Sequence, residues 1–426
     1  MHVLRNRRAA LTFIFITVTI DMLSFGIIAP VLPKLIVGFY GGRMVDAAWI
    51  TGLFGIVWAL MQFVCSPILG ILSDRFGRRP VILLSNLGMA LDYLVMALAP
   101  TVGWLFVGRI LSGMTSASMT TAGAYISDVT TQEKRAAGFG IISAAFGIGF
   151  IVGPAIGGLL GGMNPRLPFW VAGGFCLINW LYGFFVLPES LPKEKRRTTF
   201  DWRRANPLGS LRLLRSHREL SGLATINFIG YLAHEVFTVW VLYTMYRYAW
   251  SPGANGASLA VVGVTSVIVS LWCIKPIVAR FGERRTLLIG LFFGAAGMAM
   301  FGVAPNGWIF LLGIPVMMLW SIYSPAAQSL MTRHVRHDEQ GELQGALGSL
   351  RSFAMILGPG IFAGIFATFI GNTGLLRLAG APWYLACGLL LFALALAWRT
   401  TQHEPDRVVL APSPELSPEL DAAGVP

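Results

Sequence analysis

The sequence predicts an all-α integral membrane protein with twelve transmembrane helices in two six-helix repeats. Hydrophobic residues make up 55% of the 426 residues and charged residues only 12%, whereas a soluble domain carries about twice that charged fraction. Apolar stretches recur along the whole chain, and each is long enough to cross a hydrocarbon core about 30 Å thick. In lipid such stretches satisfy their backbone hydrogen bonds as helices. The two halves of the chain also match each other at a constant spacing.

The first apolar stretch is predicted to be a membrane helix rather than a cleaved leader. Arginines at positions 5, 7 and 8 precede it, as in a signal peptide, but Asp21 interrupts the stretch and no A-x-A-like cleavage site follows. The twelve predicted helices cover residues 9–37, 47–72, 80–99, 102–126, 136–161, 168–187, 220–246, 256–279, 286–304, 307–331, 342–370 and 381–398.

The positions of the charges predict the topology. Most of the 32 Lys and Arg residues lie at the chain ends and in alternate loops, and the opposite loops hold only Arg43, Arg166, Arg247 and Arg377. This positive-inside pattern places both termini in the cytoplasm. The net charge of +12 therefore points to the lipid bilayer as a partner rather than to nucleic acid. The four cysteines lie far apart in apolar stretches, so we expect no disulfide, metal site or cofactor.

A basic linker divides the chain into two bundles. Residues 188–219 interrupt the apolar pattern with clustered Lys and Arg, which is typical of a cytoplasmic segment beside anionic lipid. The predicted domains are therefore a first six-helix bundle, the linker, a second six-helix bundle and a polar, Pro-rich, disordered tail. They cover residues 1–187, 188–219, 220–398 and 399–426.

The two bundles repeat each other with an offset of 205 residues. Three landmarks recur at that offset: Arg75-Phe76-Gly77 on Arg280-Phe281-Gly282, Pro100 on Pro305, and Gly153-Pro154 on Gly358-Pro359. Six helices per repeat is an even number, so both copies enter the membrane from the same side. Such repeats are related by an axis along the membrane normal, with the substrate path at their interface.

Two motifs stand out from the apolar background. The loop after the second predicted helix reads G-I-L-S-D-R-F-G-R-R, a charge density that a simple turn does not need; its key residues are Gly70, Asp74, Arg75, Gly77, Arg78 and Arg79. The fifth predicted helix carries a small-residue face with a proline bend, formed by Gly149, Gly153, Pro154, Gly157 and Gly158. The simpler interpretations are a positive-inside loop and a packing face.

Ionisable residues inside predicted membrane helices are costly, so they are functional candidates. Asp21 and Asp92 lie about 18 Å from the cytoplasmic ends of their helices, and Arg109 lies about 13 Å from the outer end of its helix. The three therefore share a level near the membrane centre. A carboxylate there changes its proton affinity with the side that admits water, which predicts proton coupling. A static ion pair holding the helices together is the alternative.

The second half offers its own buried charges. His234 and Glu235 lie next to each other in the seventh helix, so only one is expected to face a central cavity, and both are further candidates for proton coupling. Arg351, in the eleventh helix, could pair with Glu235. Substrate contacts are predicted for Gln62, Asn227, Trp240 and Arg351.

The loop string resembles the signature of the major facilitator superfamily, and the fifth-helix string resembles its antiporter motif. With Asp21, Asp92 and the Gly108-Arg109 segment, the chain is similar to the tetracycline efflux branch of the drug–proton antiporters. This resemblance implies that the loop acts as a gate at the cytoplasmic side and that the direction is export. The second loop copy differs, with Lys275, Ala279 and Glu283 at key positions.

Two departures from that branch concern the substrate. No histidine lies in the eighth helix, where Ser266 takes the corresponding position, and Gly294 stands where an acid is expected in the ninth. Tetracycline is therefore one open choice of substrate among others.

The resulting prediction is a monomeric proton-coupled antiporter in the bacterial inner membrane that exports an amphipathic, drug-like molecule. No G-x-x-x-x-G-K-[ST] nucleotide-binding string is present. The alternatives are a metabolite or sugar transporter of the same fold, working by symport as one option, and a membrane enzyme or receptor. The last is weakly supported, because no catalytic constellation lies in a loop.

Overall fold

The computed structural model describes residues 2–116, 118–130, 135–196, 213–214, 218–336, 339–371 and 378–402. Helices make up the regular structure, and no strand occurs in these ranges. Most of the predicted linker and of the predicted tail lies outside the described residues. The predicted boundaries at 188–219 and 399–426 therefore stay predictions.

The first half is built from α1 (His2–Ile28), α2 (Leu32–Phe39), α3 (Met44–Phe76), α4 (Arg78–Leu98), α5 (Val102–Thr115), α6 (Ser118–Val129), α7 (Arg135–Met163) and α8 (Leu167–Val186). The first predicted helix is interrupted, because α1 ends two residues before Pro30. Proline lacks an amide hydrogen and disfavours helical geometry in the residue before it, which explains the break. The fourth predicted helix corresponds to two pieces, α5 and α6.

The second half is built from α9 (Arg218–His234), η5 (Glu235–Val239), α10 (Trp240–Tyr248), α11 (Pro252–Ile268), η6 (Val269–Cys273), α12 (Ile274–Val303), α13 (Gly307–Met318), η7 (Leu319–Ile322), α14 (Tyr323–Thr332), α15 (Gln340–Ile370) and α16 (Ala381–Thr400). The predicted seventh and tenth helices each contain a 3₁₀ stretch, η5 and η7, and the eighth contains the π-helical turn η6. Such interruptions often mark hinges or functional sites.

The prediction of an all-helical membrane protein is confirmed. Ten helical segments among the described residues are long and apolar enough to cross a membrane. One of them, Pro252–Val303, has 52 residues and breaks at Gly282, where φ is 75°, between the predicted eighth and ninth helices. The shorter apolar helix α5 lies where the fourth is expected. The exact count of twelve stays a prediction.

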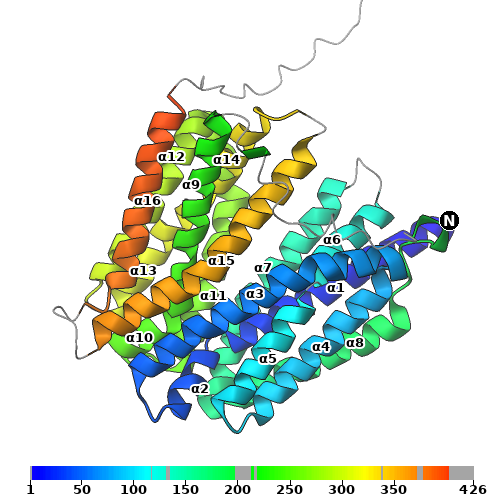
Figure 1. The fold of residues 1–426 in the computed structure, drawn as a ribbon, viewed down its shortest axis with the longest axis horizontal. Helices are drawn as coiled ribbons and strands as arrows, with labels where there is room; N and C mark the ends of the chain where they lie inside the picture. The colour runs from blue at the N-terminus through cyan, green and yellow to red at the C-terminus, as the bar shows by residue number, and fades with distance from the viewer. Residues whose placement is uncertain are drawn as a thin grey trace, which may run out of the picture.

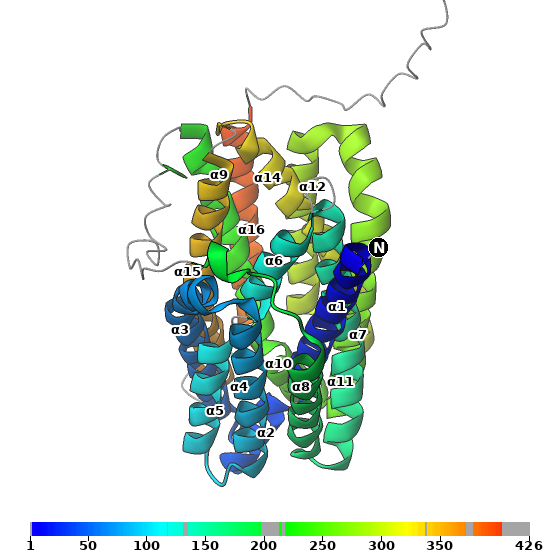
Figure 2. The same ribbon diagram turned by 90° about the vertical axis from the view of Figure 1, so that its right-hand side faces the viewer.

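The helices lie in two adjacent bundles (Figure 1), one formed by α1–α8 and the other by α9–α16. The start of α1 and the end of α16 lie toward one end of the molecule, called here the terminal end, and α2 lies at the opposite, far end (Figure 2). Figure 1 shows α3 of the first bundle and α15 of the second running side by side where the bundles meet. Toward the terminal end, the helices of the two bundles spread apart.

Glycines form the contact between the bundles near the far end. A Cβ on Gly52 of α3 would lie 2.9 Å from the Pro359 carbonyl oxygen of α15, and one on Gly364 of α15 would lie 3.0 Å from the ring of Trp49. On the other side, a Cβ on Gly256 of α11 would lie 2.2 Å from the Pro154 carbonyl oxygen of α7. At Gly52 and Gly256 the backbones of two helices are in contact, which only small residues allow, and at Gly364 the missing side chain makes room for an indole ring.

Candidate functional site

Asp21 on α1 is held by α8. Its side chain is 1% exposed, and the Asn179 amide of α8 donates to its Oδ1 at 3.0 Å. The same amide also donates to the Thr17 carbonyl oxygen at 3.2 Å. Asp21 therefore lies between two helices of the first bundle, in a place where its charge is far from bulk water.

Asp92 on α4 lies beside α5. It is fully buried, and a Cβ on Gly108 of α5 would lie 2.8 Å from its Oδ1. Arg109 and Ser112 are the α5 groups that act on it electrostatically, but neither carboxyl oxygen has a hydrogen-bond partner of normal geometry within the described residues. A buried carboxylate without such partners is costly, and binding a proton removes the charge.

Arg109 reaches the face of an aromatic ring. Its guanidinium carbon lies 5.8 Å from the ring centroid of Trp58 on α3, within the range of a cation–π interaction. The charges of Asp21 and Asp92 both act on Tyr93 and on Cys176. The two carboxyl groups and Arg109 therefore lie in one region of the first bundle. This agrees with the shared depth predicted for them from sequence. Their roles in proton coupling stay predictions.

In the second bundle, His234 and Glu235 point toward different helices. The exposed His234 ring lies 5.9 Å from the Trp320 ring of η7, centroid to centroid. Glu235 is half-buried and packs on α15, because a Cβ on Gly358 would lie 2.2 Å from the Glu235 Cβ. The two side chains were expected to point in different directions, because they are adjacent in a helix. The space left by the missing side chain of Gly358 is occupied by Glu235.

Arg351 lies on the same face of α15 as Gly358, two turns toward the terminal end. Its side chain is exposed, and its charge acts on Tyr231, His234, Glu235 and Tyr323. No ion pair joins Arg351 to Glu235 in the described part of the chain. The pairing considered for these two residues is therefore absent, because Glu235 packs against the backbone of α15 instead.

The other predicted substrate contacts have different surroundings. Gln62 on α3 is half-buried and donates to the Ser116 hydroxyl at 3.2 Å. Asn227 is 2% exposed and donates to the Leu223 carbonyl oxygen at 3.0 Å. Trp240 is 1% exposed and donates to the Ser258 hydroxyl at 3.1 Å. Gln62 lies where a ligand could reach it, whereas the last two side chains are satisfied within the second bundle.

The charged loop organises the terminal end of the first bundle. Arg78 pairs with Asp74 at 2.6 Å and with Asp128, at the end of α6, at 3.1 Å. Glu189, after α8, accepts from the amides of Arg78 and Arg79 at 2.8 and 3.3 Å. Each of these partners belongs to the first half, so in this conformation the loop ties α3, α4, α6 and the end of α8 together.

The other residues of the charged loop have different surroundings. Gly77 has a φ of 109°, which favours glycine, and a Cβ there would meet the Glu189 carboxylate at 2.1 Å. Arg75 lies over the Phe76 ring at 5.3 Å, and Arg79 donates to the Phe184 carbonyl oxygen at 2.6 Å. A Cβ added to Gly70 would meet no atom within 4 Å, so close packing does not require this glycine.

The second copy keeps the turn and changes the partners. Arg280 lies over the Phe281 ring at 5.7 Å, and Gly282 has a positive φ of 75°, as in the first copy. Glu283 pairs with Arg333 after α14 and accepts from the Ser329 hydroxyl. This local likeness supports the predicted internal repeat.

The small-residue face of α7 contacts both bundles. A Cβ on Gly149, Gly153 or Gly157 would lie within 2.7 Å of α1 atoms, the closest being 2.0 Å from Gly157 to the Ile27 carbonyl oxygen. A Cβ on Gly158 would instead lie 2.6 Å from the Pro252 carbonyl oxygen of α11. Pro154 lies inside α7, and its carbonyl oxygen faces Gly256. The face therefore joins the two bundles.

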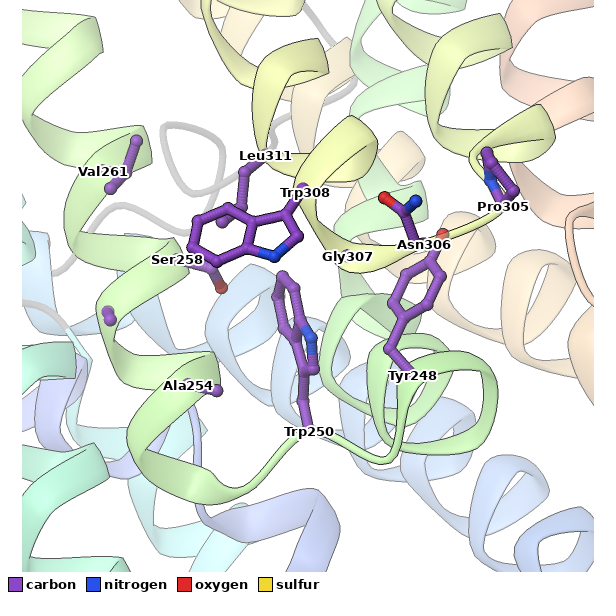
Figure 3. Close-up of a pocket in the computed structure, with 11 residues that line it drawn as sticks. Tyr248, Trp250, Ala254, Ser258, Val261, Pro305, Asn306, Gly307, Trp308 and Leu311 are labelled. Carbon is purple, nitrogen blue, oxygen red and sulfur yellow. The ribbon is translucent and has the colours of Figure 1, made fainter.

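A separate pocket lies near the far end of the second bundle (Figure 3). It has a volume of about 510 Å³ and is lined mainly by α11 and α13, with Trp250 and Trp308 among its walls. None of the predicted site residues lines it. Trp308 is 79% exposed, as is typical of a tryptophan at a membrane interface.

Sequence reasoning missed several partners of the predicted residues. Asn179 is an amide in an apolar helix, which signals a buried polar contact. Asp128 and Glu189 lie at or just after the end of a helix at the terminal end, where an acid among basic residues suggests pairing. Trp58 and Trp320 gave no signal, because tryptophan is common in membrane helices for packing alone.

Comparison with known proteins places these features in a family. The sequence model of the Major Facilitator Superfamily matches residues 14–359 and 223–421. The two matches begin about one predicted repeat apart, at the first and the seventh predicted helices.

Individual relatives match over most of their length. The class C tetracycline resistance protein of Escherichia coli is 39% identical over 383 residues, covering 89% of this chain and 95% of that protein. The class G protein of Vibrio anguillarum is 36% identical over 389 residues, covering 89% and 96%. The crystal structure of the human organic anion transporter MFSD10 (TETRAN) aligns with a TM-score of 0.68 at 25% identity, covering 92% of this chain and 99% of that one.

Proposed function

The chain belongs to the major facilitator superfamily, and we propose that it is a proton-coupled antiporter that exports an amphipathic, drug-like molecule of the tetracycline type. The observation that carries this proposal is the identity of 39% that extends over 95% of a tetracycline resistance protein. A match of that extent includes both bundles and both motifs. The multi-pass membrane architecture agrees with it.

Proton coupling is proposed for the buried acids. Asp92 is fully buried, and neither of its oxygens has a hydrogen-bond partner of normal geometry in the described ranges. Arg109 and Ser112 both lie close enough to act on it. Asp21 lies in the same region, and His234 and Glu235 supply titratable groups in the second bundle. An antiporter needs a group whose proton is exchanged against the substrate, and a buried acid beside a positive charge suits this.

The charged loop is proposed as the gate at the cytoplasmic side. The two bundles are in backbone contact near the far end, and the loop partners Asp128 and Glu189 both lie in the first half. This arrangement supports an inward-open conformation, with the terminal end in the cytoplasm and the protein in the bacterial inner membrane as a monomer. In the opposite state, the loop residues would exchange partners across the two bundles.

The alternatives receive less support. A sugar or metabolite symporter would share this fold, but the two bacterial relatives compared above are named for tetracycline resistance. Within the described part of the chain no catalytic constellation supports an enzymatic role, and we propose transport.

The proposal is tested with everted membrane vesicles that contain the protein. Respiration acidifies their interior, and tetracycline accumulation is followed by its fluorescence. We expect accumulation that a protonophore abolishes, and none in vesicles that lack the protein. Accumulation that persists with the protonophore would contradict antiport. Absence of transport for tetracycline and for a panel of other amphipathic antibiotics would contradict drug export.

A further inference from the structure

Hydrogen-bond donors gather in one corner of the second bundle, where α9, η7, α14 and α15 meet. Gly230 of α9 lies against Tyr323 of α14, since a Cβ there would lie 2.4 Å from the phenol oxygen. His234, one turn on, faces Trp320. Arg351 acts on both Tyr323 and His234 from α15. These elements thus place polar side chains around one point.

Two of these donors have no acceptor among the described residues. Trp320 is only 5% exposed, and its buried indole N–H has no hydrogen-bond partner within the described residues. Arg351 is exposed and forms no ion pair with Glu235, the acid on which it acts. A buried donor without an acceptor is costly, so the corner suits an acceptor that the described residues do not supply.

The same corner has aromatic walls. The His234 ring lies 5.1 Å from Phe237, and the Trp320 ring stacks on Tyr323 at 5.7 Å with an interplanar angle of 13°. The Cβ and Cγ of Glu235 lie against Gly358, and within the described residues its carboxylate forms no ion pair with Arg351. Flat apolar surfaces beside a guanidinium and an indole N–H suit a planar ring that carries an acidic oxygen group.

We propose that this corner binds an anionic oxygen group on the aromatic part of the exported molecule, with Arg351 as the charged donor and Trp320 as the neutral one. This inference rests on the proposed function and specifies its substrate class. It makes Arg351 a specificity-determining residue. Arg109 differs from it, because the Trp58 ring already covers its guanidinium.

The test compares two dyes that share one scaffold. 1-Anilinonaphthalene-8-sulfonate carries an anionic oxygen group, and N-phenyl-1-naphthylamine lacks it. Binding of each to the full-length protein in nanodiscs is measured by fluorescence, with empty nanodiscs as the baseline. The wild type should bind the sulfonate more tightly. Arg351→Gln should weaken sulfonate binding about tenfold, as expected for a charge-assisted hydrogen bond in a partly wet site, and should change binding of the neutral dye less than about twofold.

Two further variants make the result specific. Trp320→Phe keeps an aromatic ring, although a smaller one, and removes the N–H, so it should weaken sulfonate binding about threefold and change binding of the neutral dye less. Arg247→Gln removes an exposed arginine of α10 outside the corner and should change neither. The inference is overturned if the wild type does not prefer the sulfonate, or if Arg351→Gln weakens both dyes equally.

The outcome is separable from that of the proposed function. If tetracycline accumulates in the vesicles in a protonophore-sensitive way while the dyes are not distinguished, only the inference about the anionic group fails. If the dyes are distinguished while no antibiotic is accumulated, drug export fails and the binding site remains.

Discussion

The two bundles hold their ionisable residues in opposite ways. In the first, Asp21 and Asp92 are at most 1% exposed, and Arg109 lies against a tryptophan ring. In the second, His234 and Arg351 are exposed, and Glu235 is the acid of the described residues on which Arg351 acts. The acids of the first bundle are buried away from water, whereas the donors His234 and Arg351 of the second bundle are accessible to water. The comparison suggests that the first bundle chiefly exchanges protons and the second chiefly contacts substrate.

Loss of a buried acid should have the largest effect on export. Asp92→Asn and Asp21→Asn keep the volume and remove the exchangeable proton, so each should lower proton-driven accumulation about 100-fold or more. Asp46→Asn on α3 is the matched control, because Asp46 is a partly exposed acid paired with Arg43. Accumulation in vesicles measures the result. If Asp92→Asn and Asp21→Asn both accumulate substrate like the control, the two acids have a structural role only.

The two loop copies allow a sharper comparison. Asp74→Ala removes a carboxylate from the Arg78 network and should slow export about tenfold, with the protein still inserted, as for loss of a charged hydrogen-bonded partner. Glu283→Ala removes the acid of the second copy and should have a smaller effect. Equal initial rates for Asp74→Ala and wild type would mean that the loop sets topology only.

Packing of α7 against α1 should be intolerant of added volume. Gly157→Ala places a methyl group 2.0 Å from the Ile27 carbonyl oxygen and should cost about 1–3 kcal/mol of stability. Gly162→Ala, in the same helix, meets nothing within 4 Å. Thermal unfolding of the purified variants, followed by fluorescence, should show a lower Tm for the first only. A similar Tm for both would contradict the tight contact.

The smallest expected effect concerns the pH profile of the second bundle. Glu235→Gln removes an acid that packs against α15, the helix that contacts the first bundle, so it should shift the pH dependence of export by about half a unit or more. His234→Ala should shift it less, because this ring is exposed and does not pack against α15. Export rates between about pH 5.5 and 8.5 measure this. Unchanged profiles in both variants would confine proton coupling to the first bundle.

Much of this arrangement could be predicted from sequence, for physical reasons. Helices are local, so apolar length and the cost of unpaired backbone in lipid locate them. The glycine face of α7 and the charged loop were found because small residues and clustered charges are rare in such a background. The interruptions at η5, η6 and η7 were missed. Pro276 and Pro325 follow η6 and η7 by three residues, where a proline removes a backbone hydrogen bond of the preceding turn, but no such residue follows η5 as closely.

The sites were predictable only in part. Asp21, Asp92 and Arg109 could be brought together because helical rise alone sets depth. The direction of a side chain around its helix depends on neighbours that are distant in sequence, so Trp240 and Asn227 were placed on a cavity although both are buried and hydrogen-bonded within the second bundle. The absence of the Glu235–Arg351 pair has the same cause, because the position of Glu235 depends on Gly358, which lies in another helix.

Proton release on substrate binding is the direct test of proton coupling at the buried acids. Purified protein in weakly buffered detergent solution is mixed with tetracycline, and a pH-indicating dye follows the protons released. If substrate and proton exchange at the buried acids, the wild type releases protons on mixing and Asp92→Asn releases far fewer, while Asp46→Asn behaves like the wild type. Substrate binding without proton release in the wild type, or equal release from Asp92→Asn, would contradict proton exchange at the buried acids.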